Sequence, residues 1–167
     1  FAVLCPDTPS VQRARLVEAY KDAFVSLRSD NKEMGPLFPG AREALGALQN
    51  QDHTLLAIAT GKSRRGLDKM LERHGLAGVF HSEQVADHHP SKPHPSMILT
   101  ALNETGVAPA RAVMLGDTTY DMDMARAAGI KKIGVTWGYH AADLLLPDQM
   151  IDDFAQLAPA VDALIEV

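Results

Sequence analysis

Residues 113–121, which read VMLGDTTYD, are the part of the chain that best indicates its fold. The apolar start is typical of a strand, and the polar residues after it predict a turn into a helix. Asp117 would end the strand, and Asp121 would lie in the first turn of the helix. Two carboxylates beside a helix N-terminus suit a Mg²⁺ ion and a phosphate group. Alternatively, Asp121 only caps the helix and Asp117 only shapes the turn.

On both sides of this segment, the sequence predicts alternating helices and strands. An apolar run at residues 54–60 predicts a strand that is buried on both faces of a parallel sheet. Further strands are expected at residues 79–86, 112–115 and 133–136, and helices at residues 10–29, 41–50, 63–74, 95–106, 119–128 and 154–165. This order predicts an α/β fold with a doubly wound parallel sheet.

Composition and charge narrow the class of protein. The chain has 167 residues, of which 46% are apolar and 22% charged, values that are ordinary for one globular domain with at most a small appendage. The net charge of −5, without a long basic run, argues against nucleic acid or an anionic membrane as the main partner. The apolar runs are too short to span a bilayer. The single cysteine, Cys5, excludes an internal disulfide and favours a reducing compartment, so we expect a cytoplasmic location.

Polar residues follow three of the expected strands, where ligands bind in such sheets. Thr60 and Gly61 come after the first strand, Lys92 after the second and Asp117 after the third. Each residue also has an ordinary structural explanation: Thr60 can cap a helix, and Lys92 can be a solvated loop lysine. The nearby histidines match no zinc-binding spacing, so we do not expect a zinc site. Taken together, these residues predict a phosphate site with a hydroxyl, a lysine and two carboxylates.

These features resemble the haloacid dehalogenase-like hydrolases, and within them the phosphoglycolate phosphatase-like branch. Residues 60–62 are similar to the second motif of that family, and residues 92–95 (KPHP) to its K-P-x-P motif. Asp117 with Asp121 is similar to its acidic metal motif. The resemblance runs from about residue 36 to the end of the chain. It implies a Rossmann-like core that carries the remnant of a helical cap.

The resemblance also implies a reaction. The chain is expected to be a Mg²⁺-dependent phosphatase that acts on a small, phosphoglycolate-like metabolite through an aspartyl-phosphate. Thr60, Lys92 and Asp117 are the expected catalytic residues, and Thr60, Gly61 and Lys92 are expected to bind the substrate. Asp117 and Asp121 are expected to bind the Mg²⁺ ion.

One part of the family pattern is missing. An apolar strand ending in D-x-D-G-T, which supplies the nucleophile and the acid–base group, does not occur in these residues. We therefore expect an N-terminally truncated chain that is inactive alone, with residues 1–34 as a partial cap and residues 35–167 as a core without its first strand. In a rival interpretation, residues 1–4 form that strand, Cys5 is the nucleophile and Asp7 is the acid.

The missing strand would be the central one, between residues 54–60 and 112–115. Strand edges left open there favour association with another chain, so we predict marginal stability and self-association through the gap. Two alternative functions remain: a phosphomutase, and a catalytically silent binding or assembly module on the same scaffold. A dehalogenase is disfavoured because the acidic motif at Asp117 implies a metal.

Overall fold

The computed structural model describes residues 5–30 and 35–165, and the chain forms two compact units, Phe1–Pro36 and Leu37–Val167. The first unit contains helix α1 (Ser10–Asp30), which confirms the helix expected there. The strand that the rival interpretation places at residues 1–4 lies outside the described residues. In the described part of the chain, no helix is both long enough and apolar enough to cross a membrane.

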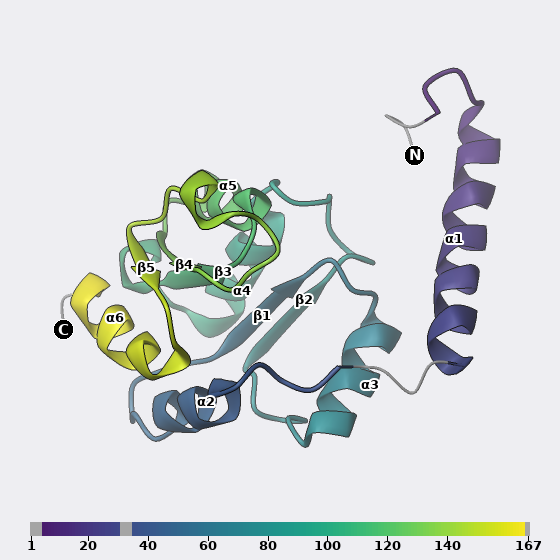
Figure 1. Cartoon of the computed structure of the whole chain (residues 1–167). Helices are drawn as coiled ribbons and strands as arrows, with labels where there is room; N and C mark the ends of the chain where they lie inside the picture. Colours follow the sequence, from purple (N-terminus) through teal and green to yellow (C-terminus); the bar gives the residue numbers. More distant parts are fainter. Residues whose placement is uncertain (1–4, 31–34, 166–167) are drawn as a thin grey trace. The chain divides into compact units, whose positions relative to one another are not determined.

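The second unit has parallel strands covered by helices, which confirms the predicted α/β class (Figure 1). Its α-helices are α2 (Ala41–Gln49), α3 (Arg64–His74), α4 (Ser96–Thr105), α5 (Thr119–Ala128) and α6 (Leu157–Leu164). Its strands are β1 (Ala57–Thr60), β2 (Ser82–Val85), β3 (Val113–Gly116), β4 (Lys131–Val135) and β5 (Gln149–Ile151). Short 3₁₀ turns cover Pro109–Arg111, Ala142–Leu144 and Phe154–Gln156.

Local signals explain most helix boundaries. The Ser63 hydroxyl accepts a hydrogen bond from the Gly66 N–H (3.2 Å) at the start of α3, and Gly75 ends that helix with φ of 61°. Several expected boundaries were wrong by a few residues: β2 covers Ser82–Val85 rather than residues 79–86, and β4 begins at Lys131 rather than at residue 133. Helix α4 begins one residue later than expected because Pro95 is its N-cap, and the last expected helix begins with a 3₁₀ turn before α6.

The strands form two separate parallel sheets. One has the order β1–β2, with Ala57 opposite Ser82 and Thr60 opposite Val85, and the other has the order β3–β4–β5. Within the described residues, β1 and β3 are therefore each paired along one edge only.

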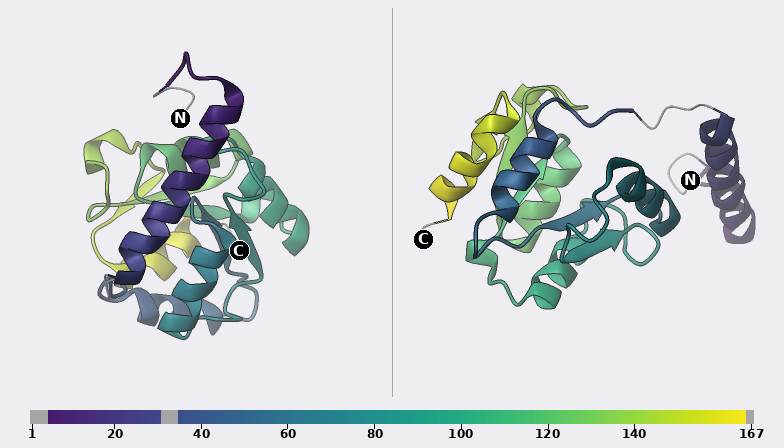
Figure 2. Two further views of the ribbon diagram at one scale, coloured as in Figure 1. Left: turned by 90° about the vertical axis from the view of Figure 1, so that its right-hand side faces the viewer. Right: turned by 90° about the horizontal axis from the view of Figure 1, so that it is seen from below.

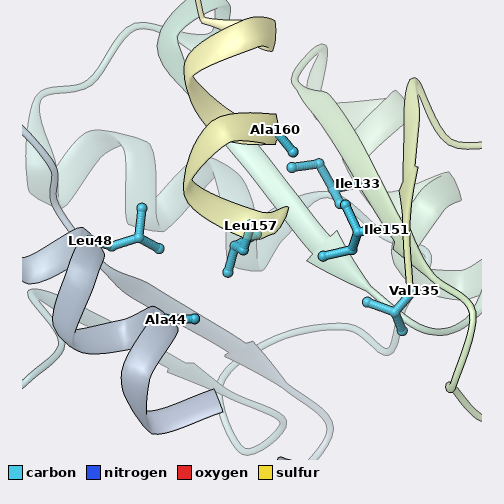
Figure 3. Packing of buried hydrophobic residues seen from close by; sticks show 7 residues of the cluster. All are labelled: Ala44, Leu48, Ile133, Val135, Ile151, Leu157 and Ala160. Carbon is cyan, nitrogen blue, oxygen red and sulfur yellow. The ribbon is translucent and has the colours of Figure 1, made fainter. Parts of the chain in front are cut away.

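The two sheets share the same helix layers, although no strand joins them. On one side, α2 contributes to the core of both sheets: Leu48 packs into the cluster shown in Figure 3. Leu45 of α2 and Ile58 of β1 both pack against a second apolar cluster, which includes Val85 of β2. On the other side, Ala59 of β1 and Met114 of β3 pack against one apolar cluster from α4 and α5. Helices α2 and α6 lie side by side (Figure 2). The sheets are thus two halves of one layer.

The expectation that residues 54–60 are buried on both faces was wrong. The strand covers only Ala57–Thr60, in which Ala57 is exposed and the other residues are half-buried. Leu55, just before it, is 44% exposed. A strand with a neighbour on one side only leaves its other edge and the adjoining side chains open. The apolar composition of this run therefore fits a strand that has a partner on both sides.

Candidate active site

Asp117 and Asp121 occupy the positions expected from the sequence, at the end of β3 and in the first turn of α5. Thr118 and Asp121 form a capping box, which satisfies backbone N–H groups at the start of α5. The Asp121 Oδ2 atom accepts hydrogen bonds from the Thr118 hydroxyl (2.7 Å) and from the N–H groups of Thr118 (3.1 Å) and Asp117 (3.3 Å). Asp121 therefore takes part in capping α5, and the cap also fixes the position of its second oxygen.

That second oxygen binds the lysine of the KPHP segment. Lys92 Nζ lies 2.6 Å from Asp121 Oδ1, and the two side chains are 20% and 7% exposed. A charge-assisted bond at this depth is much less weakened by solvent than a surface ion pair. The bond joins two residues that lie 29 positions apart in the sequence. It brings Lys92 next to the acidic segment, as expected if they belong to a single site.

Asp117 is held by the loop that follows β4. Its Oδ2 atom accepts a hydrogen bond from the Tyr139 N–H (2.9 Å), and its backbone carbonyl accepts one from the His140 N–H (3.1 Å). His140 in turn accepts a bond from the Thr119 N–H at Nδ1 (3.1 Å). The half-buried Asp117 carboxylate is therefore oriented by backbone groups.

Two glycines let the backbone approach both carboxylates. A Cβ atom on Gly116 would lie 2.3 Å from the Cβ atom of Asp121, and one on Gly138 would lie 2.3 Å from the Cβ atom of Asp117. Neither distance is sterically possible. Asp121 can therefore lie where it does only because Gly116, at the end of β3, has no side chain. Asp117 depends in the same way on Gly138, in the loop after β4.

Gly138→Ala is expected to displace Asp117 and to weaken metal binding that depends on this carboxylate. Any activity that depends on Asp117 should fall by about 10²-fold, because a misplacement of about 1 Å in a site can cost that much in rate. Gly138 has no positive φ, so the expected effect is steric rather than conformational. Gly46→Ala in α2 is the matched control, because a Cβ atom there meets nothing within 4 Å. Isothermal titration with Mg²⁺ measures the effect, and equal binding by both variants would contradict it.

Thr60 and Gly61 lie at the end of β1. The Thr60 hydroxyl accepts a hydrogen bond from the Lys62 N–H (3.2 Å), and the Lys62 carbonyl accepts one from Ala86, just after β2 (3.0 Å). Among the described residues, Thr60 is not hydrogen-bonded to Lys92 or to Asp117. The structure therefore brings together Lys92, Asp117 and Asp121 by direct bonds, and it places Thr60 and Gly61 at the end of a strand in the other sheet.

Arg64 fixes the turn after β1 against β2. Its backbone N–H donates to Asp87 Oδ2 (2.6 Å), and its guanidinium donates to the Glu83 carboxylate (2.6 Å). The Glu83 carboxylate, and to a lesser extent Asp68, raises the pKa of the Arg64 guanidinium. Arg64 thus serves to connect the two loops that carry Thr60 and Lys92.

The oxygen atoms present suit a hard cation such as Mg²⁺. In the described part of the chain, no group of three or more histidine, cysteine or acidic side chains is arranged to hold a metal. Mg²⁺ needs no such cage, since it keeps several waters and binds one or two carboxylates together with phosphate oxygens. Asp117 fits that role, whereas both oxygens of Asp121 already accept hydrogen bonds.

Sequence reasoning missed several residues that shape this site. The Thr118 cap had a visible signal, because Thr118-x-x-Asp121 has the spacing of a capping box. The backbone bonds from Tyr139 and His140 to Asp117 had none, because they join segments that are distant in the sequence. Gly138 had no local signal either, because its importance depends on the close approach of Asp117, which lies 21 positions earlier in the sequence.

A family model for haloacid dehalogenase-like hydrolases matches residues 7–135. The chain belongs to this family. It is 41% identical over 138 residues to "Probable phosphatase IndB" of Dickeya dadantii, an alignment that covers 80% of this chain and 59% of the relative. It is 30% identical over 159 residues to the phosphoglycolate phosphatase of Escherichia coli K12, covering 93% of this chain and 62% of the relative.

A solved structure shows the same fold. The crystal structure of a predicted phosphoglycolate phosphatase from Haemophilus somnus 129pt aligns with a TM-score of 0.77 at 27% identity and covers 86% of this chain and 65% of that one. This likeness confirms the Rossmann-like α/β class of the family. The chain spans about 60% of the length of the two curated relatives.

Proposed function

We propose that the protein is a Mg²⁺-dependent phosphatase that hydrolyses a small, phosphoglycolate-like monoester through an aspartyl-phosphate. The observation that carries this proposal is the contact of the half-buried Lys92 with the buried Asp121 beside Asp117, at the carboxyl end of β3. The names of the family relatives, two of which are phosphatases by name, support the same reaction class. The net charge of −5 and the absence of basic runs favour a small substrate over nucleic acid.

Lys92 is the proposed counter-charge for the phosphate. A phosphate dianion next to several carboxylates is strongly repelled in a partly desolvated cleft, and a fixed ammonium offsets that repulsion. Asp121 holds the ammonium in place. Thr60 and Gly61 are proposed to bind the phosphoryl oxygens through the hydroxyl and a backbone amide.

Asp117 is the proposed direct ligand of the Mg²⁺ ion. When bound, the ion supplies positive charge that stabilises the phosphoryl oxygens during transfer. Asp121 completes the acidic pair, but its use as a second direct ligand requires one of its oxygens to exchange a hydrogen bond for the metal. We therefore assign Asp121 chiefly to the support of Lys92 and of the start of α5.

The nucleophile is proposed to come from a strand that fills the gap between β1 and β3. Residues 1–34 are proposed to be part of a helical cap and residues 35–167 a core without its first strand. This placement would put an aspartate at the same sheet edge as Thr60 and Asp117. The chain alone is then expected to bind Mg²⁺ without turning over substrate, and we propose that the protein acts in the cytoplasm.

A phosphatase assay on two proteins tests this proposal. The first is the 167-residue chain, and the second, called the extended protein, carries in addition an N-terminal strand ending in D-x-D-G-T and the rest of a cap. Release of phosphate from phosphoglycolate by the extended protein alone, and only with Mg²⁺, is the expected result. An extended protein that binds Mg²⁺ but releases no phosphate favours the silent binding module, and conversion of a sugar phosphate without release favours a phosphomutase.

Self-association through the open strand edges is a further expectation for the 167-residue chain. Sedimentation velocity is expected to show dimers or larger species that increase with concentration, because β1 and β3 each offer unpaired backbone groups. The extended protein is the control, and it should stay monomeric. A compact monomeric chain that melts above about 65 °C, beyond the usual range for such domains, would contradict this prediction.

A further inference from the structure

A set of polar side chains connects β2 to α4: two of them, on β2, are buried, and the third, Glu104 of α4, is exposed. The Ser82 hydroxyl donates to Glu104 Oε2 (2.7 Å), and the Gln84 Nε2 group donates to Ser82 Oγ (2.8 Å) and to Glu104 Oε2 (2.8 Å). Ser82 and Gln84 are 3% and 7% exposed. Buried polar groups with complete hydrogen bonding hold a single arrangement, because each displaced group would lose its partner without gaining water.

This set extends into the loop that carries Lys92. Because the Gln84 amide nitrogen faces Ser82 and Glu104, its carbonyl oxygen faces His89, whose Nε2 atom lies 2.9 Å away and donates the proton. On the other side of the ring, His89 Nδ1 lies 2.8 Å from the hydroxyl of Ser96. The half-buried imidazole is therefore bonded at both nitrogens, to β2 and to the first residue of α4.

We propose that His89 is a positioning residue that holds Lys92 against Asp121. His89 precedes Lys92 in the loop and Ser96 follows it, so the bond between them closes the base of the loop. Closing a loop at its base reduces the number of conformations open to the residues inside it. The ammonium then stays at the Asp121 carboxylate before any phosphate arrives. The catalytic importance of this role rests on the proposed phosphatase function, while the positioning itself does not.

The chemical reactivity of Lys92 tests the proposal in the 167-residue chain. The chain is treated briefly with an acetylating N-hydroxysuccinimide ester, and the modification of each lysine is measured by mass spectrometry. Lys69 and Lys131 are exposed and serve as internal references. His89→Ala is expected to raise the rate at Lys92 about five- to tenfold relative to the references, as for the loss of one or two neutral hydrogen bonds.

Three further variants separate positioning from general stability. His88→Ala is the matched control, because His88 is an exposed histidine one position away, and it should react like the unmodified chain. His89→Asn can still bond to Ser96 and is expected to restore most of the protection. Ser96→Ala keeps the bond between His89 and Gln84 and opens only the base of the loop, so it should raise the rate about fivefold even if His89→Ala folds poorly.

An unchanged rate at Lys92 in Ser96→Ala and in any folded His89→Ala would overturn the proposal. An equal rise at Lys92, Lys69 and Lys131 would also overturn it, because that pattern indicates loosening of the whole domain. Selective exposure of Lys92 supports the positioning role whether or not the extended protein releases phosphate. The phosphatase assay and the lysine modification therefore test the two proposals independently, and either proposal can fail without the other.

Discussion

Asp117→Asn in the extended protein is expected to lower the rate of phosphate release by at least about 10³-fold, through loss of the carboxylate proposed to bind Mg²⁺ directly. An asparagine amide is a poor ligand for Mg²⁺ but keeps a carbonyl oxygen. That oxygen can still accept the hydrogen bond from the Tyr139 N–H, so the free energy of unfolding should change by less than about 1 kcal/mol. Steady-state kinetics and urea unfolding measure the two effects.

Asp123→Asn is the matched control for this variant. Asp123 lies nearby in α5 and pairs with Arg126 at 2.8 Å, but the two side chains are 43% and 73% exposed. Its substitution removes the same charge with little expected effect on rate or stability. If Asp117→Asn keeps more than a tenth of the activity, the metal assignment is wrong, and equal losses in both variants would point to net charge instead.

Asp121→Ala is expected to destabilise the chain by about 3 kcal/mol, near the lower end of values for breaking a buried ion pair. Lys92 would be left without its partner at 20% exposure, and the start of α5 would lose half of its capping box. Urea unfolding of the 167-residue chain measures the change. This test does not depend on any activity.

A double-mutant cycle separates the two contributions. Lys92→Met removes the ammonium and keeps much of the apolar stem, so Asp121→Ala combined with Lys92→Met should recover about 1–2 kcal/mol of the loss. The remaining loss then reports the cap. If the double variant is no more stable than Asp121→Ala alone, the ion pair does not stabilise the fold as argued.

Local signals were sufficient to predict much of this structure. The run from Val113 through Asp121 carries its own strand, turn and capping information within a few residues, so its geometry was predicted correctly. Gly75 and Gly129 mark helix ends in the same local way. Strand β5 was missed because its three residues are too few to show a period.

Features that depend on distant neighbours could not be predicted from the sequence. The exposure of β1 depends on which strands lie beside it, and its composition alone indicated full burial. The bonds from Tyr139 and His140 to Asp117 arise only when two segments that are distant in the sequence meet. The two acidic residues and the Thr118 cap that orients Asp121 could therefore be predicted from the sequence, whereas the backbone groups that orient Asp117 could not.

The separation of the strands into two sheets affects how the domain unfolds locally. Backbone amides of β4 are bonded within a sheet on both sides, whereas β1 and β3, in the part of the chain that the structure describes, each have a strand along one edge only. Amide hydrogen exchange should consequently be slowest in β4 and much faster along the facing edges of β1 and β3. A strand inserted between β1 and β3 would slow exchange on both edges at once. The two sheets would then be joined by hydrogen bonds, so the domain would unfold as one cooperative unit.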